Sequence, residues 1–300
     1  MLQQSGNRQN PAYIISTMLI KSLLSLFTIL TAIFLLGCSQ SEPATPEPAT
    51  ATAVSPSPTT GVTDVELWIP SPKTSWQWQL NVLPIDQSID AEMYDIDLFD
   101  NDAATVAELH AQGRSVVCYV NVGGWEQWRP DADLFPKEII GENLDDWVGE
   151  RWLDIRRIDQ LAPIMEARMD SCQAKGFDGL EPDNIDGFLN DTGFPLTYAD
   201  QLEYNIWLAD AAHARGLSIA LKNDMDQIAD LLSHFDWALN EECFQFEECD
   251  TLLPFVAAGK AVFNVEYELA TSEFCAQAIA LGFNSLKKNL NVDAERESCD

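Results

Sequence analysis

Basic residues are scarce in this sequence. Its 300 residues include only 17 Lys and Arg against 48 Asp and Glu, which gives a formal net charge of −31. Because nucleic-acid binding needs a basic surface, this balance predicts that nucleic acid is not a partner. The same charge has two other readings: it attracts a cationic partner, or it only keeps an exported protein soluble.

Several catalytic and cofactor-binding motifs are also absent. No G-x-S-x-G elbow is present, which disfavours a serine hydrolase. No G-x-G-x-x-G or P-loop follows an apolar run, which weakens a nucleotide-binding fold. No C-x-x-C pair occurs and none of the three histidines lies beside a cysteine, which disfavours zinc. We therefore expect no cofactor and no catalytic metal, and we place His110, His213 and His234 on the surface of helices.

The first 63 residues differ from the rest of the chain. Residues 1–37 hold a lone Lys21 and then an apolar run, which predicts a secretory signal peptide, with a membrane-spanning anchor as the alternative. The ending "LLGC" resembles the bacterial lipobox, so Cys38 is the predicted lipidation site, and Met18 is the better start. Residues 38–63 are rich in Pro, Thr, Ser and Ala and read as an extended tether to a body at 64–300.

The remaining six cysteines predict disulfides, because an even count in an exported domain is typical of a disulfide framework. They are Cys118, Cys172, Cys243, Cys249, Cys275 and Cys299. Cys243 and Cys249 are close enough in sequence for a small loop, and Cys275 with Cys299 would fasten the C-terminus. Fifteen pairings are formally possible, so the sequence leaves the connectivity open.

A repeated phrase predicts the fold of the body. "AQGRSVVCYV", "AKGFDGLEP", "ARGLSIALKN", "AAGKAVFNVEY" and "ALGFNSLKKN" each run from Ala-x-Gly through a short apolar segment to polar residues. The glycine is typical of a helix C-terminus, and the apolar segment is typical of a buried parallel strand. Alternating helices and parallel strands predict an α/β fold, which we interpret as a (β/α)8 TIM barrel.

Nine segments compete for the eight strands of this barrel. They are 76–80, 93–99, 115–120, 151–155, 177–181, 218–222, 237–241, 261–267 and 285–289. We expect the first or the last to be peripheral. The gap between the first two is too short for a helix, so the N-terminal opening should be irregular, and a long loop should follow the third strand.

The C-terminal ends of the strands predict the functional site, because TIM barrels carry their active sites there. Polar or aromatic candidates for substrate binding lie at or near these ends. They are Asp97, Tyr119, Asn121, Trp125, Trp128, Asp154, Lys222, Asn223, Glu266 and Lys287. Flat aromatic faces at a polar mouth suit stacking on sugar rings, so these residues together favour a carbohydrate ligand.

Carboxylates at two strand ends favour glycoside hydrolysis, which needs one acid and one nucleophile or base. The stretch "KGFDGLEPDNIDGF" contributes Asp178, Glu181, Asp183 and Asp186. Glu181 and Asp183 share a face by strand alternation, and Asp183 is nearer the mouth. In "NEEC", alternation does not decide between Glu241 and Glu242. Structural calcium is the alternative use of the first cluster, although Ile185 breaks the EF-hand spacing.

Four phrases in this order resemble one family. "CYVNVGGWEQWRPD", "KGFDGLEPDNIDGF", "LSIALKND" and "WALNEECFQFEEC" are similar to the endo-α-1,4-polygalactosaminidases of glycoside hydrolase family 114. The resemblance covers about Trp76 to Asn291. It implies a TIM barrel and an endo-acting hydrolase of α-1,4-linked galactosamine polymers. It also implies a catalytic Asp183, in "PDN", and a catalytic Glu241, in "NE", with Glu181, Glu242 and Asp186 as supporting candidates.

The substrate implied by the resemblance agrees with the charge of the chain. Galactosamine polymers carry amines and are polycations near neutral pH, so an acidic body would attract them, and Asp97 or Asp154 could pair with sugar ammonium groups. Two alternatives stay open: a non-catalytic sugar-binding lipoprotein on the same barrel, and a glycosidase of another exopolysaccharide. We expect a monomer, lipid-anchored to the cell envelope, with the outer membrane or cell surface favoured.

Overall fold

The structure is a computed structural model that describes residues 67–144 and 147–299. The predicted signal peptide, the lipidation site Cys38 and nearly all of the segment before the body lie outside the described residues, so these stay predictions. No helix in the described part of the chain is long and apolar enough to cross a bilayer.

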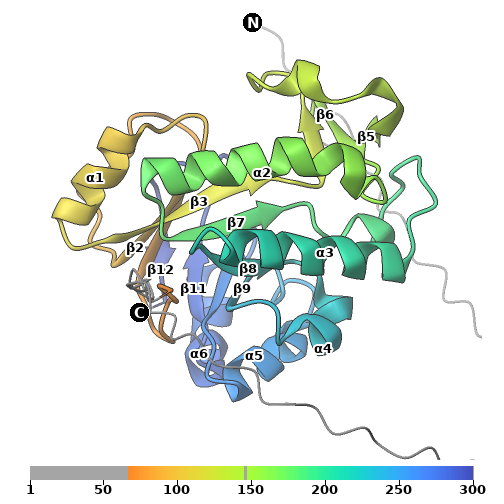
Figure 1. The fold of residues 1–300 in the computed structure, drawn as a ribbon. Helices are drawn as coiled ribbons and strands as arrows, with labels where there is room; N and C mark the ends of the chain where they lie inside the picture. The colour runs from red at the N-terminus through yellow and green to blue at the C-terminus, as the bar shows by residue number, and fades with distance from the viewer. Residues whose placement is uncertain (1–66, 145–146, 300) are drawn as a thin grey trace, which may run out of the picture. The chain divides into compact units, whose positions relative to one another are not determined.

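Within the described residues, one curled sheet of nine strands forms the centre of the body (Figure 1). Eight of its strands are parallel and follow the chain order: β1 (Trp76–Gln79), β2 (Met93–Asp97), β3 (Ser115–Asn121), β7 (Gly179–Asp183), β8 (Ser218–Lys222), β9 (Trp237–Glu241), β10 (Val262–Glu266) and β11 (Asn284–Lys287). The ninth, β12 (Glu297–Ser298), pairs antiparallel with β11. Most residues of the parallel strands are buried, as expected of strands covered on both faces. The predicted (β/α)8 barrel is confirmed.

Helices cover the outer face of this sheet (Figure 1). They are α1 (Ala103–Ala111), α2 (Ile158–Lys175), α3 (Tyr198–His213), α4 (Ile228–Leu231), α5 (Leu253–Ala257) and α6 (Thr271–Leu281). Gly176 ends α2 with φ 91°, and its N–H donates to the carbonyls of Cys172 and Gln173. Glycine adopts this left-handed conformation without strain, which explains the Ala-x-Gly phrase. The other four glycines of the phrase also have positive φ.

One predicted barrel strand is wrong. Residues 151–155 overlap β6 (Glu150–Leu153), which belongs to a separate antiparallel sheet with β4 (Gly124–Glu126) and β5 (Ile140–Asn143). The strands expected to be peripheral, the first and the last, are barrel strands instead. The physical reason is pairing: the chain folds back after β3, and β6 forms its hydrogen bonds with β4 and β5 and not with a barrel strand. The predicted long loop after the third strand is this folded insertion.

The barrel closes between its first and last parallel strands through side chains and the C-terminal segment. The Trp76 indole donates to the Asn284 carbonyl at 3.0 Å. The Leu80 amide donates to the Val292 carbonyl at 2.9 Å, and the Gln77 amide group donates to the Ala294 carbonyl at 2.9 Å. No helix lies between β1 and β2, so the predicted irregular opening is confirmed.

Two hydrophobic clusters fill the body. One packs the helices against the outer face of the sheet, and the other contains the aromatic side chains Trp76, Trp78, Trp237 and Phe263. Trp68 packs against this second cluster. A Cβ atom built on Gly179, the first residue of β7, would lie 3.4 Å from the Trp68 ring. Trp68 therefore lies at the end of the barrel where the strands begin.

Three disulfides connect the six cysteines of the body: Cys118–Cys172, Cys243–Cys249 and Cys275–Cys299. The second and third are the two pairings that the spacing suggested. The first ties β3 to α2. Disulfides of this kind are typical of exported proteins.

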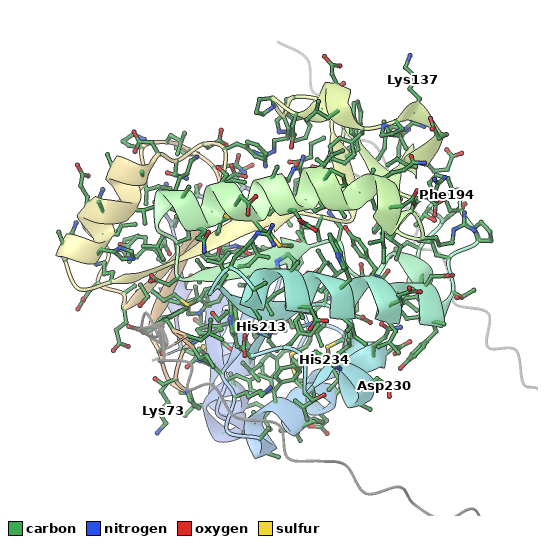
Figure 2. The ribbon with its side chains drawn as sticks, in the orientation of Figure 1. Lys73, Lys137, Phe194, His213, Asp230 and His234 are labelled. Atoms are coloured by element: carbon green, nitrogen blue, oxygen red, sulfur yellow. A yellow bond between two sulfur atoms is a disulfide. The ribbon has the colours of Figure 1, made fainter. Side chains whose placement is uncertain are left out.

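His213 and His234 lie among the outer helices (Figure 2), and His234 falls in the turn after α4 and not in a helix as predicted. His213 on α3 contacts the Asp236 carboxylate at 2.9 Å, and His110 on α1 contacts Asp178 at 2.8 Å. Both carboxylates also accept a backbone N–H at the start of a strand, from Ile219 and Val116. These histidines therefore support the outer layer of the barrel.

Candidate active site

A pocket of about 330 Å³ opens at the C-terminal ends of the strands. Three consecutive barrel strands end in its lining: β7 in Asp183, β8 in Lys222 and β9 in Glu241. The residue after each of these ends, Asn184, Asn223 or Glu242, has a positive φ of 55–63°. Asparagine tolerates this conformation better than glutamate, so the backbone at Glu242 is strained. These turns leave the three strand-end side chains grouped at the pocket.

Asp183 is surrounded by donors. Its carboxylate accepts from the Tyr119 hydroxyl at 2.8 Å and from the Lys222 ammonium at 3.0 Å, and its side chain is 20 % exposed. Burial raises the pKa of Asp183, but Lys222 and the Tyr119 hydrogen bond outweigh it, so the pKa lies below its usual value. Burial also raises the pKa of Tyr119 well above 10.0, so this tyrosine remains a donor. Asp183 is therefore an ionised group that faces the pocket.

Glu241 faces the same pocket from β9. It accepts from the Asn223 amide at 2.9 Å, lies 3.2 Å from the Lys222 ammonium and also accepts from the Tyr267 hydroxyl. Its side chain is 25 % exposed. Glu242 points elsewhere and lines a neighbouring cavity instead. Of the two residues that strand alternation could not separate, Glu241 is thus the one beside Asp183.

Lys222 joins the carboxylates of this site. It is 2 % exposed, its ammonium donates to Glu181 at 2.9 Å and to Asp183 at 3.0 Å, and it lies 3.2 Å from the Glu241 carboxylate. Burial opposes its charge, but the surrounding carboxylates outweigh burial and raise the pKa of Lys222 well above 10.5. One oxygen of Asp183 lies 3.0 Å from the Lys222 nitrogen, and one oxygen of Glu241 lies 3.2 Å from the same nitrogen. The distance between these two oxygens cannot exceed the sum, about 6.2 Å.

Glu181 lies beneath the pocket and does not reach it. It is fully buried, and it accepts from the Trp78 indole at 2.9 Å as well as from Lys222. Burial raises the pKa of Glu181, and the charge of Lys222 opposes that rise. Glu181 shares a face of β7 with Asp183, as the alternation predicted, but a buried carboxylate cannot touch a sugar.

Six of the predicted site residues line the pocket: Tyr119, Asp183, Asp186, Lys222, Asn223 and Glu241. Asp186 follows β7 and is close to Asp183. Burial and the charge of Asp183 raise the pKa of Asp186 to about 6. Asp186 therefore changes its charge in the range where glycoside hydrolases work.

The pocket also contains Trp152 and residues that the prediction missed, among them Trp78, Trp147, Asn184 and Glu150. Trp152 and Glu150 come from β6, which the sequence placed in the barrel. Burial, together with the charges of Glu126 and Asp183, raises the pKa of Glu150 to about 7. Trp78 is on the first strand, and its ring lies 4.9 Å from the Lys222 ammonium. An aromatic residue inside a barrel strand carries no signal that separates the pocket from the core.

Four predicted substrate-binding residues lie outside the pocket lining. The charged group of each is already ion-paired or hydrogen-bonded to another part of the protein. Asp97 binds Arg129 through both carboxylate oxygens, and Asp154 binds Arg156. Glu266 accepts the backbone N–H groups of Phe244 and Gln245. The ammonium of Lys287 donates to the carbonyls of Tyr267 and Leu269. Because Asp97 and Asp154 are already paired with arginines, this geometry does not favour their predicted pairing with sugar ammonium groups.

The other three candidates lie near the pocket but outside its lining. Asn121 is buried, donates to Glu150 at 3.1 Å and accepts from Asn184 at 3.0 Å, so it holds two lining residues in place. Trp125 lines a cavity beside the pocket, and Trp128 is 52 % exposed on the insertion.

Two further cavities adjoin the pocket and share its walls. One shares Leu144 and Trp147, and it continues along the insertion to Trp125 and Arg151. The other shares Trp147, Asp186, Asn223 and Glu241, and it continues past β9. The rest of its lining is mostly acidic or apolar: Leu189, Met225, Asp226, Asn240, Glu242, Phe246, Glu248, Tyr267 and Leu290. Trp147 lines all three cavities, and we call the pocket and these two cavities together the groove.

The described residues contain no group of three or more His, Cys, Asp and Glu side chains placed to hold a metal ion. The lining of the pocket supplies carboxylates, a lysine and the Tyr119 hydroxyl. Two carboxylates from different strands of a (β/α)8 barrel, facing one pocket with aromatic walls, define a glycoside hydrolase site.

The comparisons with known proteins identify the family. The chain belongs to glycoside-hydrolase family GH114, whose family model matches residues 57–300. The family resemblance seen in the sequence is thereby confirmed, and the protein is a glycoside hydrolase.

Three relatives illustrate the range of similarity. Ega3 of Aspergillus fumigatus, solved in complex with galactosamine, is 42 % identical with a TM-score of 0.75, over 80 % of this chain and all of that chain. The glycoside hydrolase domain of PelA from Pseudomonas aeruginosa is 14 % identical with a TM-score of 0.60, over 75 % of this chain and 98 % of that chain, and shows the fold alone. An uncharacterised protein of Deinococcus radiodurans is 27 % identical over 74 % of this chain and 79 % of its own length.

Proposed function

We propose that this protein is an endo-acting hydrolase of cationic, galactosamine-containing polysaccharide with α-1,4 linkages, and that Asp183 and Glu241 carry the reaction. The observation that carries the proposal is the meeting of these two carboxylates, from β7 and β9, at the Lys222 ammonium in one pocket. Glycosidic bond cleavage needs two such groups on either side of the scissile bond.

The environment of each carboxylate suggests its role. The lowered pKa of Asp183 suits a nucleophile, whose oxygen attacks the anomeric carbon. Glu241, in its protonated form, donates a proton to the leaving glycosidic oxygen as the carbon–oxygen bond breaks and becomes a carboxylate. A water then gives its proton to Glu241 and attacks the anomeric carbon, which releases the sugar and restores the Asp183 carboxylate. Tyr119 and Tyr267 donate to the two carboxylates and orient them.

The separation of the two carboxylates favours retention of the anomeric configuration. Retaining enzymes hold their carboxyl groups about 5–5.5 Å apart, and inverting enzymes about 6.5–9.5 Å apart. The upper limit of about 6.2 Å between the two oxygens that contact Lys222 fits the retaining arrangement. The first product released from an α-linked substrate should therefore carry the α configuration, which proton NMR during early turnover reports.

The groove supports a polymeric substrate cleaved at internal positions. It extends from the pocket into two adjoining cavities, which offer room for more than one sugar unit. On the side beyond β9, Asp226, Glu242 and Glu248 offer carboxylates, and Phe246 is 64 % exposed. An apolar sugar face suits Phe246 and an ammonium group suits the carboxylates, so this part of the groove fits an amino sugar.

Two further observations support a cationic substrate. The net charge of −31 would concentrate a polycation at the surface of the enzyme. The 42 % identical relative Ega3 was solved with galactosamine, a sugar that carries the required amine. Together with the acidic part of the groove, these observations favour galactosamine units over neutral sugars.

The place of action rests on the N-terminal sequence. We propose that Cys38 is lipidated after removal of residues 1–37, and that the tether at 38–63 holds a monomeric body at the cell envelope. The three disulfides support export. Labelling with a radioactive fatty acid, abolished by Cys38→Ala, tests the anchor.

The activity is tested by incubating the purified chain with partly deacetylated α-1,4-galactosaminogalactan and identifying oligosaccharides by mass spectrometry. Asp183→Asn and Glu241→Gln should each abolish product, because each removes one of the two reacting carboxylates. Glu242→Gln is the matched control at the neighbouring position and should retain product. Turnover that survives in Asp183→Asn would contradict the assignment, and product from a neutral glycan alone would redirect the substrate.

A further inference from the structure

Asp95 is a buried carboxyl group for which the proposed reaction has no use. It lies in the middle of β2 and is fully buried. Among the described residues, no N–H or O–H donor lies within hydrogen-bond distance of either of its oxygens. An ionised carboxylate in such a place would lose its hydration without compensation, which is a large cost.

The group whose charge acts most strongly on Asp95 is another carboxyl group, that of Glu181 on β7. Two buried carboxylates that act on each other in this way repel, and a proton on one of them removes the repulsion. Glu181 already accepts from the Trp78 indole and from Lys222, both of which favour its ionised form. Asp95 has no such donors, so the proton belongs on Asp95.

The surroundings of Asp95 agree with this assignment. The charged groups that act on it are Glu181 and Asp183 from β7 and Lys222 from β8. Its register partners on β1 and β3 are Trp78 and Val117, which do not titrate. Burial, and then the charge of Glu181, raises the pKa of Asp95 well above its ordinary value.

We propose that Asp95 is a protonated positioning residue, whose carboxyl O–H donates to Glu181 so that the Glu181 anion holds Lys222 between Asp183 and Glu241. The Lys222 ammonium donates to Glu181 and Asp183 at 2.9 and 3.0 Å and forms an ion pair with Glu241 at 3.2 Å. A weaker hold by Glu181 would let the ammonium shift toward the other two carboxylates. The role in catalysis rests on the proposed function, whereas the protonation of Asp95 does not.

The protonation is tested by folding stability, which needs no substrate. An Asp95 that keeps its proton when folded releases it on unfolding at neutral pH. Above about pH 4, this one group therefore lowers the folding equilibrium constant by a factor of ten for each pH unit. Asp95→Asn keeps the shape and supplies an N–H donor without a titrating proton. In the full chain with this substitution, the plot of folding free energy against pH should have a slope that is smaller by the equivalent of one proton. At pH 8 the variant should be more stable than wild type.

Asp97→Asn is the matched control, because it is the same substitution two residues along β2. Asp97 binds Arg129 as an anion, so its neutralisation should lower stability at pH 8, opposite in sign to Asp95→Asn. A carboxylic-acid carbonyl band in the infrared spectrum at pH 8, absent from Asp95→Asn, gives a direct signature. Destabilisation by Asp95→Asn at pH 8, or an unchanged slope, would overturn the protonation.

The positioning role is tested by the kinetics of Asp95 variants with partly deacetylated α-1,4-galactosaminogalactan as substrate. Asp95→Leu removes the donor to Glu181 and should lower kcat at least tenfold with little change in KM and with a shifted pH profile. Asp95→Asn restores the donor and should bring kcat back to within about threefold of wild type. Equal kcat in wild type and Asp95→Leu would overturn positioning. If Asp95→Leu fails to fold, a wild-type pH profile and kcat in Asp95→Asn support the role, and a tenfold loss there overturns it.

These arms separate failure of the inference from failure of the proposed function. If wild type shows no turnover of the galactosamine polymer, the proposed function fails, while the stability slopes of Asp95→Asn and Asp97→Asn still decide the protonation. If wild type turns over normally and the slopes do not differ, the inference fails and the proposed function stands.

Discussion

Replacing Lys222 by methionine should destabilise the fold in a way that depends strongly on pH. Methionine has a similar length and no charge, so the substitution keeps most of the packing against Trp78 and removes the ammonium that faces three carboxylates. Those carboxylates, Glu181, Asp183 and Glu241, lie 2.9–3.2 Å from the ammonium. Without it they would repel one another across the floor of the pocket.

The magnitude follows from the burial of the cluster. Each pair at about 3 Å interacts by about 5 kcal/mol at an effective dielectric constant near 20, and desolvation of the ammonium offsets much of that. Removing one partner of a buried ion pair costs about 3–5 kcal/mol in practice. We expect that loss at pH 8. At lower pH the unpaired carboxylates take up a proton in the folded state, which recovers up to about 1.4 kcal/mol per pH unit. At pH 5 the loss should therefore be about 1 kcal/mol.

The sign of this pH dependence can be checked group by group. In wild type the pKa of Lys222 is raised, so its stabilisation is present throughout the range from pH 5 to pH 8. In the variant the carboxyl pKa values rise above their unfolded values, so the variant loses stability as pH rises. Urea denaturation at pH 5 and pH 8 measures the difference. An equal loss at both pH values would mean that only packing was lost and would refute the electrostatic reasoning.

Lys288 offers a matched control for this experiment. It is also buried, at 3 % exposure, but its ammonium donates to the backbone carbonyl of Asp293 and not to a carboxylate. Burial lowers the pKa of Lys288 to about 8. Lys288→Met should therefore cost less than about 1 kcal/mol at either pH, since a buried charge without a close counter-charge stabilises little. A large loss in Lys288→Met would show that the methionine itself disturbs these strand ends.

Three further predictions concern substrate binding. Because the pKa of Glu150 is raised to about 7, the pocket becomes more negative between pH 5.5 and pH 7.5. KM for galactosamine oligomers should therefore fall severalfold over that range. In Glu150→Gln, KM should change less with pH. Phe246→Ala should raise KM about fivefold with kcat unchanged, if about 40 Å² of sugar surface contacts the ring at about 25 cal/mol per Å²; an unchanged KM would remove Phe246 from the groove. Raising the salt from 0.05 M to 0.5 M should raise KM for the polymer sharply, because screening shortens the reach of the acidic surface, and salt-insensitive turnover would argue against a cationic substrate.

The fold was predictable because its signals are local and repeated. The Ala-x-Gly phrase marks a helix end and the next buried strand, and five copies suffice to indicate a parallel barrel. The insertion was not predictable in the same way. The apolar residues of β6 look like those of a barrel strand, and only the pairing of Gly124 with Trp152 in space shows otherwise. β6 pairs with β4 and β5 because the chain reverses direction after β3, and no local sequence pattern indicates this reversal.

The site was predictable in part for a related reason. Strand ends bring Asp183, Lys222 and Glu241 together wherever a barrel forms. Whether a carboxylate there remains available depends on cations from elsewhere. Asp97 is at a strand end too, but Arg129 from the insertion occupies it. The sequence shows which residues lie at strand ends, but it does not show which of them are paired with a cation from another segment. Asp97 and Asp154 were therefore indistinguishable from pocket residues.

The position of Trp68 has a practical consequence. This residue packs beside Gly179, where the barrel strands begin, whereas the pocket is where they end. The described chain thus starts on the face away from the groove. A purified body coupled to a bead or a sensor chip through its N-terminal side should keep its groove accessible to long polymers. Coupling through Lys137, the one lysine of the insertion, would place the linker on the pocket side and serves as the comparison (Figure 2).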